Sequence, residues 1–211
     1  AKIETDFGGF SGSNTMLRIR QAYVNLDWGK SAVLVGITWH PLFGAVMPDV
    51  LNLSTGAPFQ PFNRSPQIRY QYKANSRVQL TASVLWQLQY LSSGPKGMSE
   101  DYIKNSCIPE MFVGADFTPA DGWLMGLGAH MISLKPRTST EWKEQTFKVN
   151  ERMTAFSYEA HLKYSGRNYT FAAKTLMASA LDHTALLGGY GVSSVDSRTG
   201  EQGYTPFRHS T

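Results

Sequence analysis

Two neighbouring stretches, QIRYQYK at 67–73 and RVQLTASV at 77–84, alternate polar and apolar residues without exception. Every odd-numbered position is polar and every even-numbered position is apolar. Because successive side chains of a β-strand point to opposite faces, Ile68 and Leu80 share one face and Arg69 the other. The short segment between the stretches predicts a hairpin. One face of this hairpin is suited to hydrocarbon and the other to water.

Similar alternation and turn signals run along the whole chain. They predict strands near 1–9, 16–28, 31–40, 66–73, 76–90, 109–118, 122–135, 146–164, 168–181 and 184–192. Tight connections, as at 73–76 and 165–168, alternate with long ones, as at 41–65 and 91–108. This layout is typical of a transmembrane β-barrel, in which short turns lie at one end and long loops at the other. A change of apolar parity near Gln21 predicts a β-bulge there.

The fold class expected from these patterns is all-β, an antiparallel transmembrane β-barrel with about ten strands in this chain. No linker divides residues 1–211, so a single outer-membrane barrel domain is expected. The polar residues at 208–211 do not resemble a closing aromatic strand. We therefore expect the domain to be incomplete at its C-terminus, and the ten strands either close by themselves or form an arc of a larger barrel.

Composition narrows the classes of protein. Glycine and aromatic residues are abundant and only 17% of residues are charged, which favours strands. No apolar stretch approaches the roughly 20 residues of a membrane-spanning helix. The net charge of +4 comes without a Lys/Arg run, so no nucleic-acid partner is expected. The single cysteine, Cys107, can form no disulfide within the chain.

If the apolar face contacts outer-membrane lipid, the polar face lines a water-filled lumen. Cations are prominent among its side chains, and arginines fixed across a narrow passage lower the barrier for anions. The predicted pore-lining residues are Arg18, Arg20, Gln67, Arg69, Gln71, Arg77, Gln79 and Lys174. The same face is expected to carry Gln87, Gln89, Glu110, Asp116, His130, Glu159, His161 and Lys163. As an alternative, Glu110, Asp116 and Glu159 neutralise the cations in structural ion pairs.

The long loop at 41–65 is rich in proline and aromatic residues, which favours a rigid, packed loop. It is a candidate constriction loop, with Asp49 and Arg64 as its charged groups. Alternatively it covers the outside of the barrel or packs against a neighbouring subunit.

Catalysis finds little support in the sequence. The five histidines, His40, His130, His161, His183 and His209, are scattered and have no metal-ligand spacing. No Ser or Cys near them has a recognisable nucleophile context. We therefore expect no enzyme activity, no cofactor and no metal.

Three segments, LRIRQAYV at 17–24, LVGITW at 34–39 and FNRSPQIRY at 62–70, carry a family resemblance. In order and spacing they resemble the amino-terminal half of DcaP-like outer-membrane porins, in particular those of Bacteroidetes, over roughly residues 1–90. The resemblance implies a homotrimeric diffusion porin with about sixteen strands, located in the bacterial outer membrane and passing small anionic solutes such as dicarboxylates. It also implies that Arg18, Arg20 and Arg69 belong to a basic ladder in the lumen.

Two other functions fit the same patterns. A β-sheet binding module, for example for glycans, would use the aromatic residues as a stacking platform and would bury the apolar strand faces under a second sheet. A structural subunit of a cell-envelope complex would pair an open arc of strands with other chains and form no pore.

Overall fold

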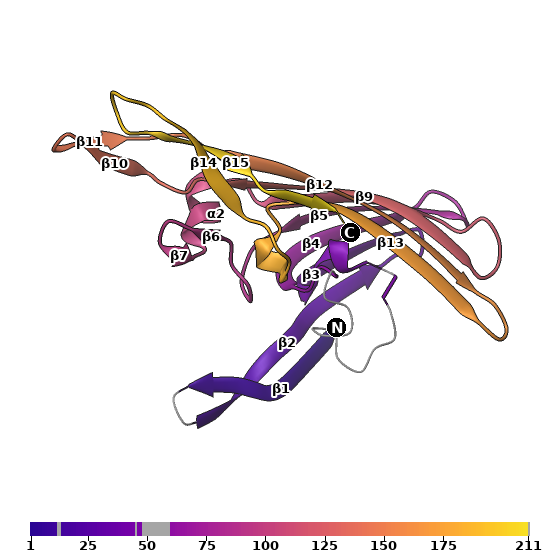
Figure 1. The fold of residues 1–211 in the computed structure, drawn as a ribbon. Helices are drawn as coiled ribbons and strands as arrows, with labels where there is room; N and C mark the ends of the chain where they lie inside the picture. Colours follow the sequence, from indigo (N-terminus) through magenta and orange to yellow (C-terminus); the bar gives the residue numbers. More distant parts are fainter. Residues whose placement is uncertain (12–13, 45, 48–59, 211) are drawn as a thin grey trace.

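The structure, a computed structural model, describes residues 1–11, 14–44, 46–47 and 60–210. Its main body is one antiparallel sheet of ten strands, which confirms the expected all-β class (Figure 1). The strands, in sheet order, are β1 (Lys2–Ser11), β2 (Asn14–Asp27), β3 (Ser31–Trp39), β4 (Arg64–Lys73), β5 (Val78–Leu85), β8 (Glu110–Phe117), β9 (Trp123–Leu134), β12 (Met153–Ser165), β13 (Thr170–Ser179) and β16 (Arg208–Ser210). Among the described residues β1 and β16 are the edges and do not pair with each other, so the sheet is open. Of the two expectations, closure within the chain or an arc of a larger barrel, closure is not observed.

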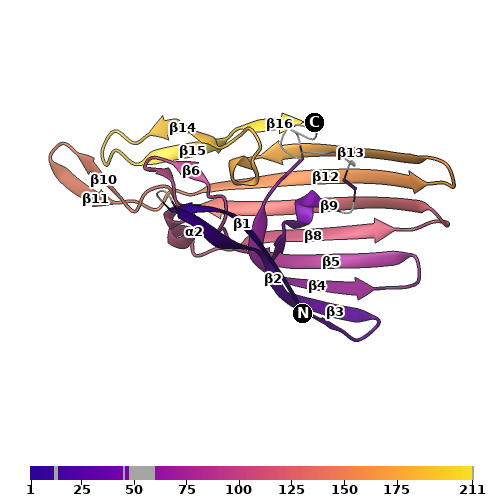
Figure 2. The same ribbon diagram turned by 90° about the horizontal axis from the view of Figure 1, so that it is seen from below.

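The strands follow the chain order, as expected for a meander. Tight turns gather at one end of the sheet, while the smaller elements lie at the opposite end (Figure 2). These elements are β6 (Ser93–Gly94), β7 (Gly97–Met98), α2 (Asp101–Ser106), β10 (Ser139–Trp142), β11 (Gln145–Lys148), β14 (Tyr190–Val195) and β15 (Gln202–Pro206). Two short 3₁₀ helices, η1 (Pro41–Phe43) and η2 (Asp182–Thr184), lie against one face of the sheet. We call this the inner face and the opposite one the outer face.

The prediction of the tenth strand was wrong. Residues 184–192 do not form a strand of the main sheet: η2 ends at Thr184, and β14 pairs only with β15 in a separate ribbon. The tenth strand is the short β16, which pairs with β13 near its end. Glycines at 188 and 189 adopt positive φ angles, 152° and 92°, which interrupt the extended backbone there.

The bulge expected near Gln21 is present. Glu4 of β1 pairs with Gln21, but the next residue, Thr5, pairs with Ile19. Arg20 is therefore the extra residue on β2, and the alternation of side chains changes there. This places Arg20 beside Arg18 on the side of the hairpin that carries Asp6.

In the central strands the alternating apolar side chains are exposed and the polar ones are buried, which is the reverse of the usual order in soluble proteins. In β8, Val113 is 58% exposed on the outer face, whereas Glu110 is 1% exposed on the inner face. In β12 and β9, Phe156 and Leu127 are likewise exposed, whereas Glu159 is buried. The apolar residues of the alternating pattern thus lie on the outer face, and the polar residues lie on the buried inner face.

The apolar core lies on the inner side, between the sheet and the segments folded over it. One cluster joins η1 to the sheet and to η2: Leu42, Leu85, Phe112, Leu176, Ala178, Leu181 and Leu186. A second packs α2 against β9 and β12 through Tyr102, Ile103, Ile132, Leu134, Met153, Ala155 and Ala180. In the described part of the chain, no helix has the length and apolar character needed to cross a membrane.

Candidate functional site

A cavity of about 400 Å³ lies on the inner face, between β4, β5, β8, β12 and the start of the loop after β3. Three of the predicted pore-lining residues, Arg69, Gln71 and Gln79, line it. Asp116 and Glu159 also face it. The strict alternation of β4 and β5 brings these side chains together, because residues paired across two strands share a face.

Arg69 is held by neutral partners. Its guanidinium donates to the side-chain oxygen of Gln67 at 2.7 and 3.0 Å and to the backbone oxygen of Trp39 at 2.7 Å. Gln67 is itself buried and donates to the backbone oxygens of Thr38 and Trp39. Within the described residues no carboxylate lies within 4.0 Å of the Arg69 guanidinium. No described residue therefore neutralises the charge of Arg69 in an ion pair.

The other predicted cations on β2 do have acidic partners. Arg18 contacts Asp6 through two hydrogen bonds of 2.7 and 3.0 Å. Arg20 lies 3.0 Å from Asp6 and 3.2 Å from Glu4. These two arginines are thus in ion pairs, but with Glu4 and Asp6 of β1 and not with Glu110, Asp116 or Glu159, the acids that the ion-pair alternative named.

Lys174 on β13 holds the loop after β3. Its ammonium donates to the backbone oxygens of Leu42 and Phe43 and lies 3.8 Å from Glu159. Glu159 and Asp116 both contact His161, at 3.3 and 3.1 Å. Gly126 makes room for that imidazole, because a Cβ there would lie 2.3 Å from the ring.

The remaining predicted residues lie elsewhere. Arg77 is exposed in the turn between β4 and β5, away from the cavity. Arg64, the first residue of β4, is buried with its guanidinium carbon 4.0 Å from the centre of the Trp39 ring. Asp49 lies outside the described residues, so its predicted role in a constriction stays a prediction.

The two described ends of the long loop fold onto the inner face. At the first end, His40 leads into η1, and Leu42 is fully buried among residues of β5, β8 and β13. At the second end, the backbone N–H of Phe62 donates to the backbone oxygen of Thr184 at 2.7 Å, and the Asn63 side chain donates to the backbone oxygen of His183 at 2.9 Å. Both ends therefore lie inside the curve of the sheet.

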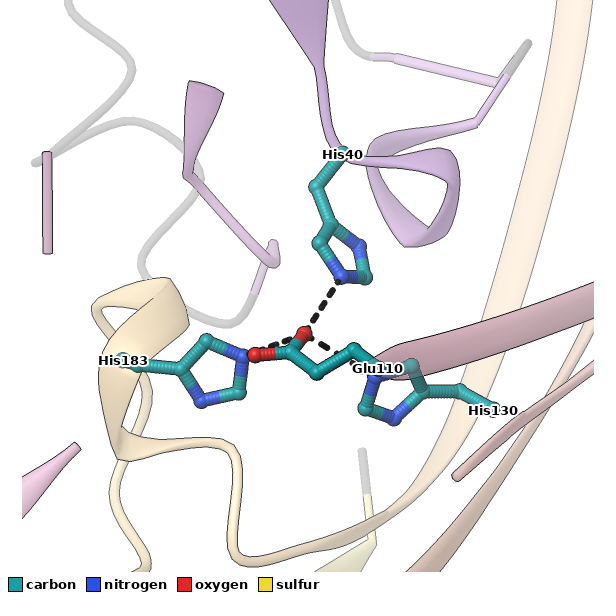
Figure 3. A group of neighbouring side chains, drawn as sticks. All are labelled: His40, Glu110, His130 and His183. Atoms are coloured by element: carbon teal, nitrogen blue, oxygen red, sulfur yellow. Dashed lines mark hydrogen bonds and ion pairs between the residues drawn. The ribbon is translucent and has the colours of Figure 1, made fainter. Parts of the chain in front are cut away.

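A second group of side chains meets near these loop ends. Glu110, at the start of β8, points toward three imidazoles that come from separate parts of the chain (Figure 3). Its Oε2 atom lies 3.1 Å from Nε2 of His183, 3.3 Å from Nε2 of His130 and 3.4 Å from Nε2 of His40. All four side chains are 0–1% exposed. We call this group the histidine–glutamate cluster.

Further contacts fix the cluster. Gln87 donates to the other oxygen of Glu110 at 2.8 Å, and Gln87 is held in turn by Ser92. The backbone N–H of Leu42 donates to Nδ1 of His40 at 3.2 Å. In the described residues, Nδ1 of His130 and Nδ1 of His183 have no hydrogen-bond partner.

Burial affects the charge of two of these imidazoles in opposite ways. It lowers the pKa of His40 to about 4, so that this ring is neutral at pH 7. Burial also opposes the charge of His183, but the nearby Glu110 carboxylate outweighs it and raises the pKa of His183. The Glu110 carboxylate thus interacts with imidazoles whose pKa values shift in opposite directions.

The alternation of polar and apolar residues predicted Glu110 and His130 on the polar face but gave no sign that the four residues meet. His40 and His183 lie in connections rather than strands, so the period-two pattern carried no information about them. The cluster could have been inferred from the predicted strand ends, because three of its residues lie at the same end of the sheet. Glu110 begins β8, His40 follows the end of β3, and His183 follows the end of β13.

The chain was compared with protein-family models and with curated proteins. No protein-family model matches the chain, and no curated protein matches it either.

Proposed function

We propose that the ten-stranded sheet is part of the wall of an outer-membrane β-barrel, a porin that lets small hydrophilic solutes, preferentially anions, diffuse passively through a water-filled lumen. The observation that carries the proposal is the exposure of the two faces. Large apolar side chains such as Val113 and Leu127 are exposed on the outer face, while Gln67, Glu110 and Glu159 are buried on the inner face.

Lipid is the solvent that suits such an outer face. Exposed apolar residues recur on neighbouring strands, including Ile68, Leu80, Val84, Met125 and Phe171. Soluble monomers rarely expose contiguous apolar areas larger than a few hundred Å². A binding module would need a second sheet over this face, and the described residues place none there. In a membrane barrel, alternate residues contact acyl chains and no cover is required.

Arg69 supports the preference for anions. It lines the inner cavity without a carboxylate partner among the described residues, whereas Arg18 and Arg20 are paired with acids. Asp116 and Glu159 face the same cavity and oppose this effect, but both lie close to His161, and Glu159 also lies close to Lys174. A fixed guanidinium next to a wet passage lowers the barrier for an anion and raises it for a cation.

The proposed porin is a homotrimer in the bacterial outer membrane, as the family resemblance implies. It is in contact with lipid and carries out no enzymatic chemistry. The open sheet fits an arc of a larger barrel, since strand pairing in lipid must be completed to leave no exposed edge. The loop after β3, which is held on the inner face at both described ends, would narrow the passage.

Conductance in planar bilayers tests the proposed function. The full-length protein, purified in detergent, is added to a bilayer that separates two salt concentrations. We expect discrete current steps and a reversal potential that favours the anion. Folded protein that produces no steps would refute the porin function.

One observation favours a second function. The unpaired edges of β1 and β16 could pair with strands of other chains in a structural complex of the cell envelope that has no pore. That function predicts detergent-soluble, folded protein without conductance, and co-purification of a stoichiometric partner chain.

A further inference from the structure

The histidine–glutamate cluster has the composition and spacing of a metal site. We propose that His40, Glu110, His130 and His183 bind one divalent transition-metal ion of the zinc class, and that this ion fastens the loop after β3 and η2 to the sheet. The inference rests on the cluster alone and does not depend on the porin function.

The distances support a tetrahedral ion. Ligand atoms around a tetrahedral zinc with bonds of about 2.0–2.1 Å lie roughly 3.3–3.4 Å apart. The three Nε2 atoms lie 3.1, 3.3 and 3.4 Å from Oε2 of Glu110, and all four atoms lie within 4.8 Å of one another. Only those separations among the four ligand atoms that exceed the tetrahedral value have to shorten for the atoms to surround one ion.

The contacts without an ion are crowded. A carboxylate oxygen has about two lone-pair sites, yet three imidazoles meet at the same Oε2 atom. Their distances of 3.1–3.4 Å exceed the roughly 2.7–2.9 Å of good charge-assisted hydrogen bonds. A cation between the four atoms would replace these three long contacts with direct bonds. It would also compensate a carboxylate that is only 1% exposed.

The donor types select the metal. Three imidazole nitrogens and one carboxylate oxygen suit zinc and its first-row neighbours, whereas magnesium and calcium prefer oxygen ligands. The surrounding hydrogen bonds meet a second requirement of metal sites, because Gln87 fixes the remaining oxygen of Glu110. Four protein ligands that are fully buried are typical of a structural rather than a catalytic zinc site.

The three imidazoles of the cluster are not equally ready to bind a metal ion. His130 and His183 can carry their proton on Nδ1 and turn the Nε2 lone pair to the ion without breaking a described hydrogen bond at Nδ1. His40 now accepts the Leu42 N–H at Nδ1, so binding through Nε2 requires this imidazole to give up that contact. Metal binding is therefore coupled to the start of η1.

Metal binding by the full-length protein in detergent tests the site. The protein is stripped with a chelator and titrated with Zn²⁺ against a chromophoric competitor, and a second sample is loaded with Co²⁺. We expect one tightly bound ion per chain and the intense visible bands of tetrahedral cobalt. Weak octahedral bands, or less than a tenth of an equivalent of bound zinc, would overturn the proposal, and this measurement on the unaltered protein decides even if variants fail to fold.

Variants locate the ion. His130→Gln and His183→Gln should each lower zinc affinity by more than roughly 100-fold, since losing a ligand costs more than losing a residue that only supports one. His209→Gln on β16, outside the cluster, is the matched control and should leave affinity unchanged. Equal affinities in folded cluster variants and the control would assign any bound metal to another place. Metal binding is measured without a bilayer. A chain that binds no metal can therefore still conduct ions, and a chain that does not conduct can still bind metal.

Discussion

At the scale of single residues, the inner face contains both compensated and uncompensated charge. Arg18 and Arg20 share Asp6 on β1, and Arg20 also pairs with Glu4, whereas Arg69 donates to a side-chain amide oxygen and a backbone oxygen among the described residues. Surface ion pairs contribute little to stability but remove most of the field that a passing ion would feel. Arg69 is therefore the cation expected to influence selectivity most.

Replacing Arg69 by glutamine tests this expectation. A unit charge about 6 Å from the ion path in water attracts an anion by roughly 0.7 kcal/mol and repels a cation by the same amount, which together change the permeability ratio of anion to cation by about tenfold. Arg69→Gln should lower that ratio by about this factor, as measured from the reversal potential in a salt gradient. Arg77→Gln, in the exposed turn, is the control and should change it little. An unchanged ratio in Arg69→Gln would remove Arg69 from the selectivity determinants.

Residue parity predicted which face most of these side chains occupy but not their partners. Gln67, Arg69, Gln71 and Gln79 lie on the inner face because alternation in β4 and β5 is strict. The bulge at Arg20 could be placed from a parity change. Ion pairing depends on which strands become neighbours and on bulge geometry, and the cluster at Glu110 depends on two connections without a repeating pattern. Local sequence carries neither kind of information.

At the scale of elements, the loop after β3 is anchored by apolar and polar contacts. Leu42 is fully buried in the cluster that includes Phe112 and Leu176, and Lys174 holds two of the loop's backbone oxygens. These contacts hold the described loop ends on the inner face, which lines the lumen in the proposed barrel.

Removing the apolar anchor should widen the passage. Leu42→Ala deletes a buried side chain at a cost of about 2–5 kcal/mol and should loosen η1 from the sheet. We expect larger and noisier single-channel conductance together with a lower free energy of unfolding. Leu187→Ala, at a position that is 80% exposed, is the control for both measurements. A destabilised variant with normal conductance would mean that the loop does not narrow the lumen.

Strands were easier to predict than connections. The bounds of β3, β4, β8, β9 and β13 lie within about two residues of the predicted ones, because alternation and tight turns are local signals. The predicted strand at 76–90 was too long, since β5 ends at Leu85. No local pattern indicated the hairpin of β14 and β15, and the pairing of β16 with β13 joins segments that are distant in the sequence.

At the scale of the whole molecule, the outer face of the proposed barrel contacts lipid. A charge placed at the middle of that face should cost about 2–4 kcal/mol in a bilayer, whereas an exposed position in water usually tolerates it within about 0.5 kcal/mol. Val113→Arg on β8 should therefore destabilise the protein by the larger amount, as measured by urea unfolding in lipid vesicles.

An inner-face substitution provides the matched comparison. Gln79 pairs with Asp116 across β5 and β8 and lines the cavity, so Gln79→Arg should be nearly neutral or slightly stabilising. If the two arginine variants had the same small effect, the outer face would not be in contact with hydrocarbon.

The most direct test is a cysteine scan of β5 in vesicles that contain lipids with a quencher on the acyl chain. With Cys107, the only native cysteine, replaced by serine, single cysteines at 79–84 are labelled with a fluorophore. In the proposed barrel, we expect quenching at Leu80, Ala82 and Val84, and little at Gln79, Thr81 and Ser83. Quenching without this period of two, or none at any position in folded protein, would contradict the claim that the apolar face of the sheet meets lipid and the polar face meets water.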